Sequence, residues 1–232
     1  IATLGFNLKN KGLIEDVKVA GSVTGNNDVA GIVNKIDEDG KIENVAFVGK
    51  INSVGNNSTV GGIAGSNYMG FVNRAYVDAT ITAQNANASM LVPFVTYMLN
   101  SWKSGTKARV TNSVAKGVLD VKNTRNVGGI VAKTWPYGAV QDNVTYAKVI
   151  KGQEIFASND VNDEDGGPHI KDLFGVVGYS SAEDGTGKDT KNPKKLKHLT
   201  KEEADKRVEG YKITADTFVS EPYALNTLNN VS

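Results

Sequence analysis

One ten-residue pattern recurs five times in the first two thirds of the chain. Each copy has an apolar residue at its third position, usually Asn or Asp at its fifth, and Gly or Ala at its tenth. The copies occupy residues 12–21, 40–49, 70–79, 108–117 and 138–147, so they begin 28, 30, 38 and 30 residues apart. A period of this length is typical of proteins that stack one structural unit per repeat. The repeat therefore constrains the fold more than any other feature of the sequence.

Three columns of residues run through the five copies. The apolar column is Ile14, Ile42, Val72, Val110 and Val140; the polar column is Asp16, Asn44, Arg74, Asn112 and Asp142; the small column is Gly21, Gly49, Ala79, Gly117 and Ala147. A second apolar block follows at residues 29–33, 60–64 and 127–131, and its third-copy counterpart is expected at 89–93 or one residue later. We expect the polar column to bond to turn backbone or to the copies above and below.

The residue types in each copy favour short β-branched strands separated by Gly and Asn turns. One such unit cannot bury its apolar face alone, whereas stacked units share a continuous core. We therefore predict an all-β fold, a parallel β-helix (solenoid) of about five coils. Strands at this spacing could also pair as hairpins, so an antiparallel sandwich is the alternative. Pro93 lies in the third copy, where the missing N–H predicts a bulge or local break.

The character of the chain changes near residue 150. Residues 1–150 carry 25 charged side chains, and the 82 residues after them carry 26. We divide the chain into solenoid repeats at 1–150 and, at 151–232, a mixed, loop-rich C-terminal cap or a junction with the next domain of a longer protein. Thr200 and Glu203 form a capping-box pattern. They predict one short helix that runs to about Val208 and is stopped by Gly210.

The composition excludes several classes of function. A net charge of +1 argues against broad nucleic-acid binding, and no apolar run is long enough to span a membrane. There is no cysteine, and His169 and His198 are the only histidines, so no His-Glu-x-x-His zinc motif exists. Acidic clusters at 37–39 and 163–165 are candidates for calcium, although neither follows the EF-hand order and solvated loops are the default. We expect no catalytic residue, no metal site and no cofactor in this chain.

The segments that join one copy to the next are expected to emerge at one corner of every coil. These segments, 34–40, 66–70, 96–106 and 133–138, carry five large aromatic side chains, including both tryptophans of the chain. The aromatic residues are Tyr68, Tyr97, Trp102, Trp135 and Tyr137. Large amphipathic rings are favoured anchors of interfaces. We predict that this aromatic edge either contacts a ligand or packs against the tail or a neighbouring domain.

The repeat resembles known families. Residues 60–81, which begin Val-Gly-Gly-Ile-Ala-Gly and continue Gly-Phe-Val-Asn, look like the GLUG repeat of bacterial surface proteins, and 29–33 and 127–131 match its first half. The combination of 12–17, 29–34 and the mixed tail is similar to the amino-terminal, non-peptidase region of streptococcal IgA1-specific zinc metalloproteases and related surface zinc metalloproteases. No residue of that family's zinc motif occurs here, so none can be carried over.

The resemblance implies a place for the chain in a larger enzyme. It implies a scaffold and substrate-recognition domain of a zinc metalloendopeptidase at the bacterial cell surface or secreted, with the zinc in the parent's catalytic domain. Its expected partners are a host glycoprotein such as IgA1 and other domains of the same polypeptide. Two alternatives stay open: an adhesin stalk of the same repeats without a peptidase, and a β-helix enzyme acting on polysaccharides. Fold alone does not decide between them.

Overall fold

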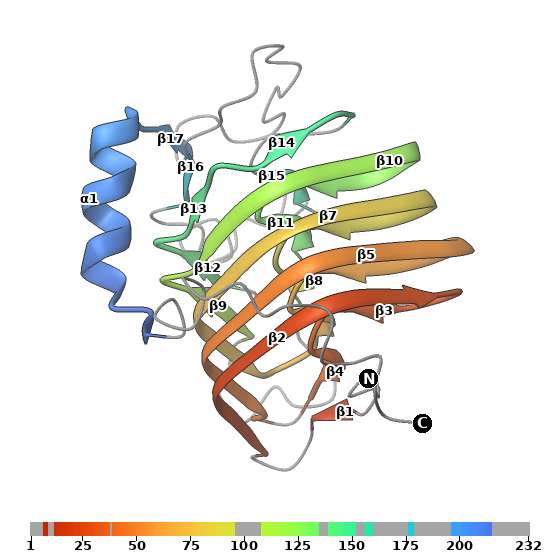
Figure 1. Ribbon diagram of the computed structural model, residues 1–232, viewed down its shortest axis with the longest axis horizontal. Coiled ribbons are helices and arrows are strands. Elements are labelled where there is room, and N and C mark those ends of the chain that lie inside the picture. The colour runs from red at the N-terminus through yellow and green to blue at the C-terminus, as the bar shows by residue number, and fades with distance from the viewer. Residues whose placement is uncertain are drawn as a thin grey trace, which may run out of the picture.

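The computed structural model describes residues 7–8, 12–37, 39–95, 108–134, 139–151, 156–159, 176–178 and 196–214. Most of these residues form a β-solenoid whose strands pair only in parallel (Figure 1). One sheet contains β2 (Leu13–Gly25), β3 (Val29–Ala30), β5 (Lys41–Gly61), β7 (Phe71–Ser89), β9 (Arg109–Thr111), β10 (Val114–Gly128), β12 (Ala139–Gln141), β13 (Val144–Thr145) and β14 (Lys148–Val149). The second contains β1 (Asn7–Leu8), β4 (Val33–Ile36), β6 (Ala64–Asn67), β8 (Phe94–Val95), β11 (Val131–Thr134) and β15 (Phe156–Asn159).

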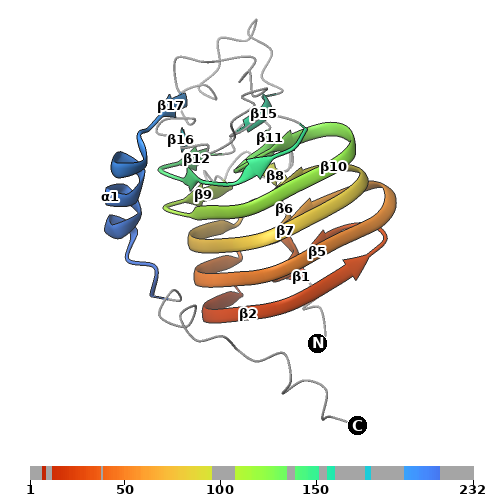
Figure 2. The same cartoon turned by 45° about the horizontal axis from the view of Figure 1, so that its top comes forward.

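The five sequence copies stack in register. The apolar column forms one continuous row, with Ile14 opposite Ile42, then Val72, Val110 and Val140. From Ile42 onward every member of this row is fully buried. Five stacked positions enclose four turns, which Figure 2 shows as successive layers. The predicted parallel solenoid is confirmed.

The strands of the first sheet are longer than the pattern predicts. β5 has 21 residues and β7 has 19, where we expected two or three short strands per copy. The polar column accounts for this in the first three copies, where β2, β5 and β7 continue through it; in the fourth and fifth copies β9 and β12 end directly before it. All five residues of the column adopt left-handed backbone conformations with φ between 50° and 54°. A single left-handed residue turns the chain sharply while hydrogen bonding continues on both sides of it. Asn and Asp tolerate this conformation better than other L-residues, and Arg74 adopts it as well.

The small column marks a second place where the backbones approach closely. Gly49 has φ of 149°, and a Cβ added there would lie 1.8 Å from the carbonyl oxygen of Gly21 in the coil below. Gly117 has the same relation to Ala79. Gly49 and Gly117 therefore cannot carry a Cβ, whereas Ala79 and Ala147 do not share their positive φ and fit a Cβ in the same column.

The second apolar block begins one residue earlier in the third copy than expected. Ala88 lies opposite both Val60 and Val127, so the counterpart is residues 88–92. Ser89 occupies the place of Gly61 in this alignment. Pro93 lies between β7 and β8, where no strand needs its missing N–H, and its carbonyl accepts a hydrogen bond of 2.8 Å from the Lys133 N–H.

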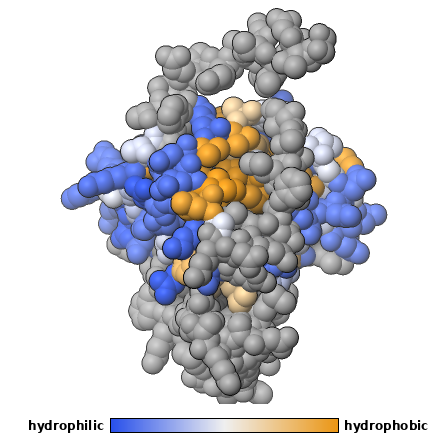
Figure 3. Space-filling view, turned by 90° about the horizontal axis from the view of Figure 1, so that it is seen from below, coloured by the Kyte–Doolittle hydropathy of each residue, from blue (hydrophilic) through white to orange (hydrophobic). Residues whose placement is uncertain are grey.

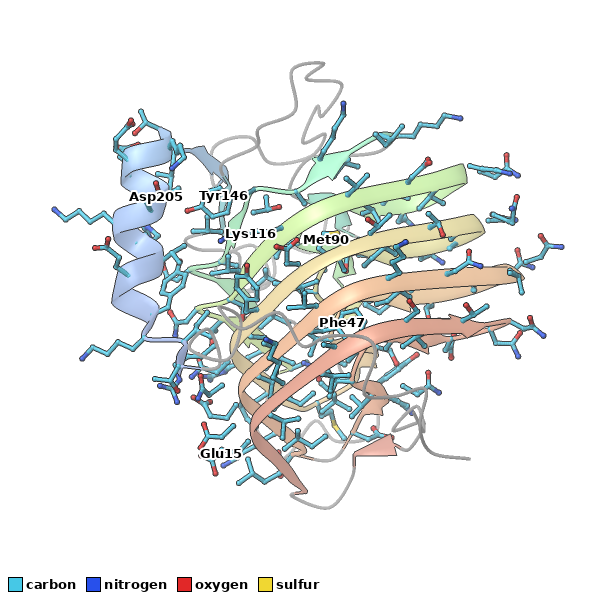
Figure 4. The ribbon with its side chains drawn as sticks, in the orientation of Figure 1. Glu15, Phe47, Met90, Lys116, Tyr146 and Asp205 are labelled. Carbon is cyan, nitrogen blue, oxygen red and sulfur yellow. The ribbon has the colours of Figure 1, made fainter. Side chains whose placement is uncertain are left out.

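The core fills the space between the two sheets. Phe47 and Met90 are among its largest fully buried side chains (Figure 4). At the end of the stack formed by β2 the same core columns are only half covered, by Ile14, Val17, Val19 and Val23. Figure 3 looks onto this end and shows apolar residues gathered at its centre, with hydrophilic residues around them.

The C-terminal region contributes a small third sheet and one helix. β16 (Val176–Gly178) pairs in parallel with β17 (Leu196–His198), and α1 (Lys201–Tyr211) follows. The predicted capping box is present: Glu203 N–H donates to the Thr200 hydroxyl, and Thr200 N–H donates to the Glu203 carboxylate. The helix continues through Gly210 to Tyr211, and Lys212 ends it with a φ of 52°. It lies along the side of the solenoid, across successive coils (Figures 1 and 2).

Candidate binding surface

The outer face of the first sheet carries an apolar row that α1 covers. Because neighbouring strands are in register, Ala46, Tyr76, Val114 and Val144 stand one above the other and point outward. They form a buried cluster with Ala204 and Tyr211 of α1, and with Leu199 and Ile213 on either side of it. We call Ala46, Tyr76, Val114 and Val144 the covered strip.

Polar contacts fasten the C-terminal segment along the left-handed column next to the covered strip. The segment descends the stack, from the fifth copy at Arg207 to the second copy at Thr214. Arg207 Nη1 donates to Asp142 Oδ1 (3.0 Å), Arg74 Nη1 donates to the Lys212 carbonyl (3.4 Å), and Thr214 N–H donates to Asn44 Oδ1 (2.9 Å). Asn44 also donates to Asp16 in the coil below, and Asn112 donates to Asn73. The contacts with Asp16 and Asn73 confirm that the polar column bonds to neighbouring coils, whereas the backbone groups that it contacts here belong to the C-terminal segment and not to turns.

A third set of contacts joins α1 to the fifth coil. The Tyr146 hydroxyl donates a hydrogen bond of 2.7 Å to Asp205 Oδ1, and Lys201 pairs with the other carboxylate oxygen. The hydrogen bonds from Lys201 and Tyr146 hold the pKa of Asp205 below its ordinary value of 3.8. Lys116 lies between the rings of Tyr76 and Tyr146, at 5.1 and 5.6 Å from their centroids. Figure 4 shows Lys116, Tyr146 and Asp205 together on this side of the molecule.

A second outward row lies on the other side of the left-handed column. Lys41, Phe71 and Arg109 are neighbours in register on β5, β7 and β9. The Lys41 ammonium and the Arg109 guanidinium each lie 5.9 Å from the centroid of the Phe71 ring. No carboxylate among the described residues pairs with either cation. We call Lys41, Phe71 and Arg109 the open strip, since Lys41 and Arg109 are exposed and Phe71 is half-buried.

The residues beside the open strip satisfy one another. Asn73 Nδ2 donates to both carboxylate oxygens of Glu43 at 3.0 Å, and its Oδ1 accepts from Thr111 Oγ1 at 2.9 Å. Arg74 Nε forms an ion pair of 2.6 Å with Glu43. Because Arg74 compensates the charge of Glu43, this carboxylate does not compete for Lys41.

The corner predicted to carry the aromatic edge connects the two sheets. The joining segments run from β4 to β5, β6 to β7, β8 to β9 and β11 to β12. Each of them therefore leaves a strand of the second sheet and leads to a strand of the first sheet. Tyr68 is the aromatic residue of this edge that the structure describes. Its N–H donates to the Ile36 carbonyl at 2.9 Å, and Lys35 lies 4.3 Å from its ring centroid and 3.0 Å from Asp37.

The rest of the predicted edge lies outside the described residues: Tyr97, Trp102, Trp135 and Tyr137. Binding at this edge stays a prediction. Lys41, Phe71 and Arg109 were missed by sequence reasoning, although a signal was available. Each of them directly precedes a member of the apolar column and must therefore point to the opposite face of its strand.

The donor set does not fit the zinc that the family resemblance implies for the parent. In the described part of the chain, no three His, Asp or Glu side chains gather in a way that could hold a metal ion. His198 lies in β17, His169 lies outside the described residues, and the sequence has no further histidine. Among the same described residues, no helix has the length and apolar character needed to cross a membrane.

Two curated proteins of Streptococcus pneumoniae serotype 4 are similar to this chain. Zinc metalloprotease ZmpB is 49% identical over 232 residues, which cover 99% of the chain and 12% of ZmpB. Zinc metalloprotease ZmpC is 32% identical over 152 residues, which cover 63% of the chain and 8% of ZmpC. No protein-family model matches the chain, and no solved structure matches it significantly. The chain is thus similar, over nearly its whole length, to a short region of streptococcal zinc metalloproteases.

Proposed function

We propose that this chain is a non-catalytic scaffold and substrate-recognition domain of a zinc metalloendopeptidase that is secreted or held at the bacterial cell surface. The observation that carries the proposal is the 49% identity to a short stretch of ZmpB over almost the whole chain. The sequence has two histidines, no cysteine and no His-Glu-x-x-His, so it lacks the motif that would place two histidines and a catalytic carboxylate on one helix. The zinc and the catalytic residues then belong to another part of the parent.

The solenoid suits the proposed role because it combines a stiff core with unequal outer faces. Five stacked copies hold side chains at fixed positions along an axis, and repeat proteins commonly use such extended surfaces for binding. The partners we propose are a host glycoprotein such as IgA1, which the joining segments and the open strip would contact, and neighbouring domains of the parent. The GLUG-type repeat and the division of the chain near residue 150 belong to the same proposal.

The test uses the full-length parent and a version from which residues 1–232 of this chain are deleted. We expect the deletion to leave the cleavage of a short peptide substrate within about twofold and to lower kcat/KM for an intact glycoprotein such as IgA1 by roughly tenfold or more, since remote binding contributes to large substrates only. An equal decrease of kcat/KM for both substrates would indicate that the domain is needed for catalysis itself and not for the recognition of large substrates. A parent without any peptidase activity would favour the adhesin alternative, and turnover of a polysaccharide by the isolated chain would favour the polysaccharide-active enzyme.

A further inference from the structure

We propose that the open strip binds an acidic glycan, with Lys41 and Arg109 pairing with its carboxylate or sulfate groups. The proposal names a ligand class for the recognition role proposed above and rests on it. Four observations support it: two cations that no carboxylate of the described residues pairs with, the ring between them, the distribution of charge along the sequence, and the hydrogen bonding of the backbone beneath the strip.

Each of the two cations contacts an aromatic ring, and no carboxylate in the described part of the chain neutralises either of them. Phe71 lies between Lys41 and Arg109, and each cation is 5.9 Å from the ring centroid. Attraction to the ring face restricts these long side chains but leaves their charge available to an anion. Arg109 and Lys41 are two strands apart, which places their backbones about 10 Å from each other along the axis. Two cations at this spacing suit a ligand that carries anionic groups at intervals.

The charge of the solenoid changes sign along its axis. Residues 12–45 contain seven acidic and three basic side chains: Glu15, Asp16, Asp28, Asp37, Glu38, Asp39 and Glu43 against Lys18, Lys35 and Lys41. Residues 79–141 contain one acidic and seven basic side chains: Asp120 against Lys103, Lys107, Arg109, Lys116, Lys122, Arg125 and Lys133. The overall charge of +1 therefore conceals a basic stretch of sequence that contains Arg109, whereas Lys41 belongs to the acidic stretch. A basic stretch attracts anions, so this observation supports the role of Arg109.

The backbone beneath the strip favours a glycan over an acidic peptide. β5 pairs with β2 on one side and β7 on the other, and β7 pairs with β5 and β9, so these ladders use the N–H and C=O groups along the strip. A peptide cannot add as a further strand here, and it loses the main-chain hydrogen bonds on which that mode of binding depends. An acidic glycan needs side chains only, because cations can pair with its acidic groups without any main-chain hydrogen bond.

The experiment measures binding of the 232-residue chain to four probes by calorimetry. They are hyaluronan oligosaccharides, which carry carboxylates only, heparin oligosaccharides, which also carry sulfates, uncharged dextran, and a poly-glutamate peptide. We expect one or both acidic glycans to bind and to lose affinity at high salt, as exposed charge pairs do. The glycan that binds more tightly identifies which acidic group is preferred. Absence of binding by both acidic glycans, or binding of dextran equal to theirs, overturns the proposal.

Variants locate the binding site. The double substitution Lys41→Gln with Arg109→Gln should weaken acidic-glycan binding by roughly tenfold or more, the equivalent of 1.4 kcal/mol. Lys50→Gln with Lys122→Gln is the matched control, because it removes the same charge from exposed residues elsewhere on β5 and β10. Circular dichroism verifies that both variants fold. Equal losses in the two variants, or tighter binding of poly-glutamate than of either glycan, overturn the proposal.

The outcome is separable from that of the proposed function. If the chain binds no acidic glycan, while deletion of the domain from the parent still slows the cleavage of an intact glycoprotein, the ligand class is wrong and the recognition role stands. If glycan binding is found and the deletion has no effect on the parent, the strip binds glycans but does not serve substrate capture.

Discussion

The covered strip and the open strip both point outward from the same sheet, on either side of the turn at the left-handed column, yet they differ in almost every property. Both are straight rows of outward side chains in register, separated only by the left-handed column. The covered strip consists of Ala, Tyr and Val beneath α1, and its residues are at most 4% exposed. The open strip places Phe71 between two cations that no acidic residue of the described chain neutralises. The helix therefore covers the row that gains from leaving water, and leaves the row whose charges remain solvated.

The largest expected difference comes from placing a carboxylate in each strip. Tyr76→Asp should lower the free energy of unfolding by about 3 kcal/mol or more, because the packing of the ring against α1 would be lost and a carboxylate would be buried in its place. Phe71→Asp should change it by less than about 1 kcal/mol, since the new carboxylate lies between Lys41 and Arg109. Denaturant unfolding of both variants measures the contrast. Similar losses in the two variants would contradict the assignment of one strip as covered and the other as open.

A smaller effect is expected in the left-handed column that divides the strips. Asn44→Val should cost about 2–3 kcal/mol, because a β-branched residue is strained at this φ and the side-chain bonds to Thr214 and Asp16 are lost. Asn44→Gly loses the same bonds without the strain and should cost about half as much. If the two variants lose the same free energy of unfolding in thermal or denaturant unfolding, side-chain hydrogen bonds and not backbone strain would explain the preference for Asn at this position.

Removal of one hydroxyl tests how α1 is fastened over the covered strip. Tyr146→Phe deletes the hydrogen bond to Asp205 and should cost about 1 kcal/mol. Tyr68→Phe is the matched control at the joining corner, where the ring contacts Lys35 and the substitution should change stability by less than about 0.5 kcal/mol. Hydrogen exchange of the α1 amides should increase in the first variant and stay unchanged in the second.

The smallest effect is the dependence of this fastening on pH. Asp205 has a lowered pKa in the folded protein, so its ionised form contributes stability that is complete above about pH 3.8 and declines as pH falls through the folded pKa. The amides of α1 should therefore exchange faster, relative to the rest of the solenoid, as pH falls below 3.8. In Asp205→Asn, the exchange of the α1 amides relative to the rest of the solenoid should no longer depend on pH in this range. An unchanged acid response in that variant would show that other carboxylates govern it.

The sequence was sufficient for the stacked core, because the repeat specifies it in five places. The apolar column, the small column and the capping box at Thr200 follow from local rules that each copy or helix obeys by itself. The length of the strands did not follow, since nothing in the pattern distinguishes a left-handed residue within a strand from a turn that ends it. The outcome at Arg74 illustrates this point, because the exception in the column adopts the same φ as its neighbours.

The site was less predictable for a different reason. The position of α1 depends on contacts between segments far apart in the sequence, such as Thr214 with Asn44, 170 residues away. The covered strip alternates with inward residues as any outward row of a strand does. Its burial is evident only from the position of α1, which the local sequence does not give. The open strip was within reach of sequence analysis, because its members can be read from the alignment of copies once the inward column is known.

The corner that joins the two sheets has a consequence for how such a protein can diversify. Between β8 and β9 the chain has 13 residues where the other three joining segments have three or four, and this accounts for the longest spacing of 38 residues between copies. The longer segment leaves Val110 opposite Val72, as if nothing had been added. The length of a joining segment can therefore change at this corner without a change of register. An added residue at the left-handed column would shift the register of the strand. Related proteins can therefore differ in these segments while the stacked strands stay the same, and the joining corner is a suitable place for inserted sequences.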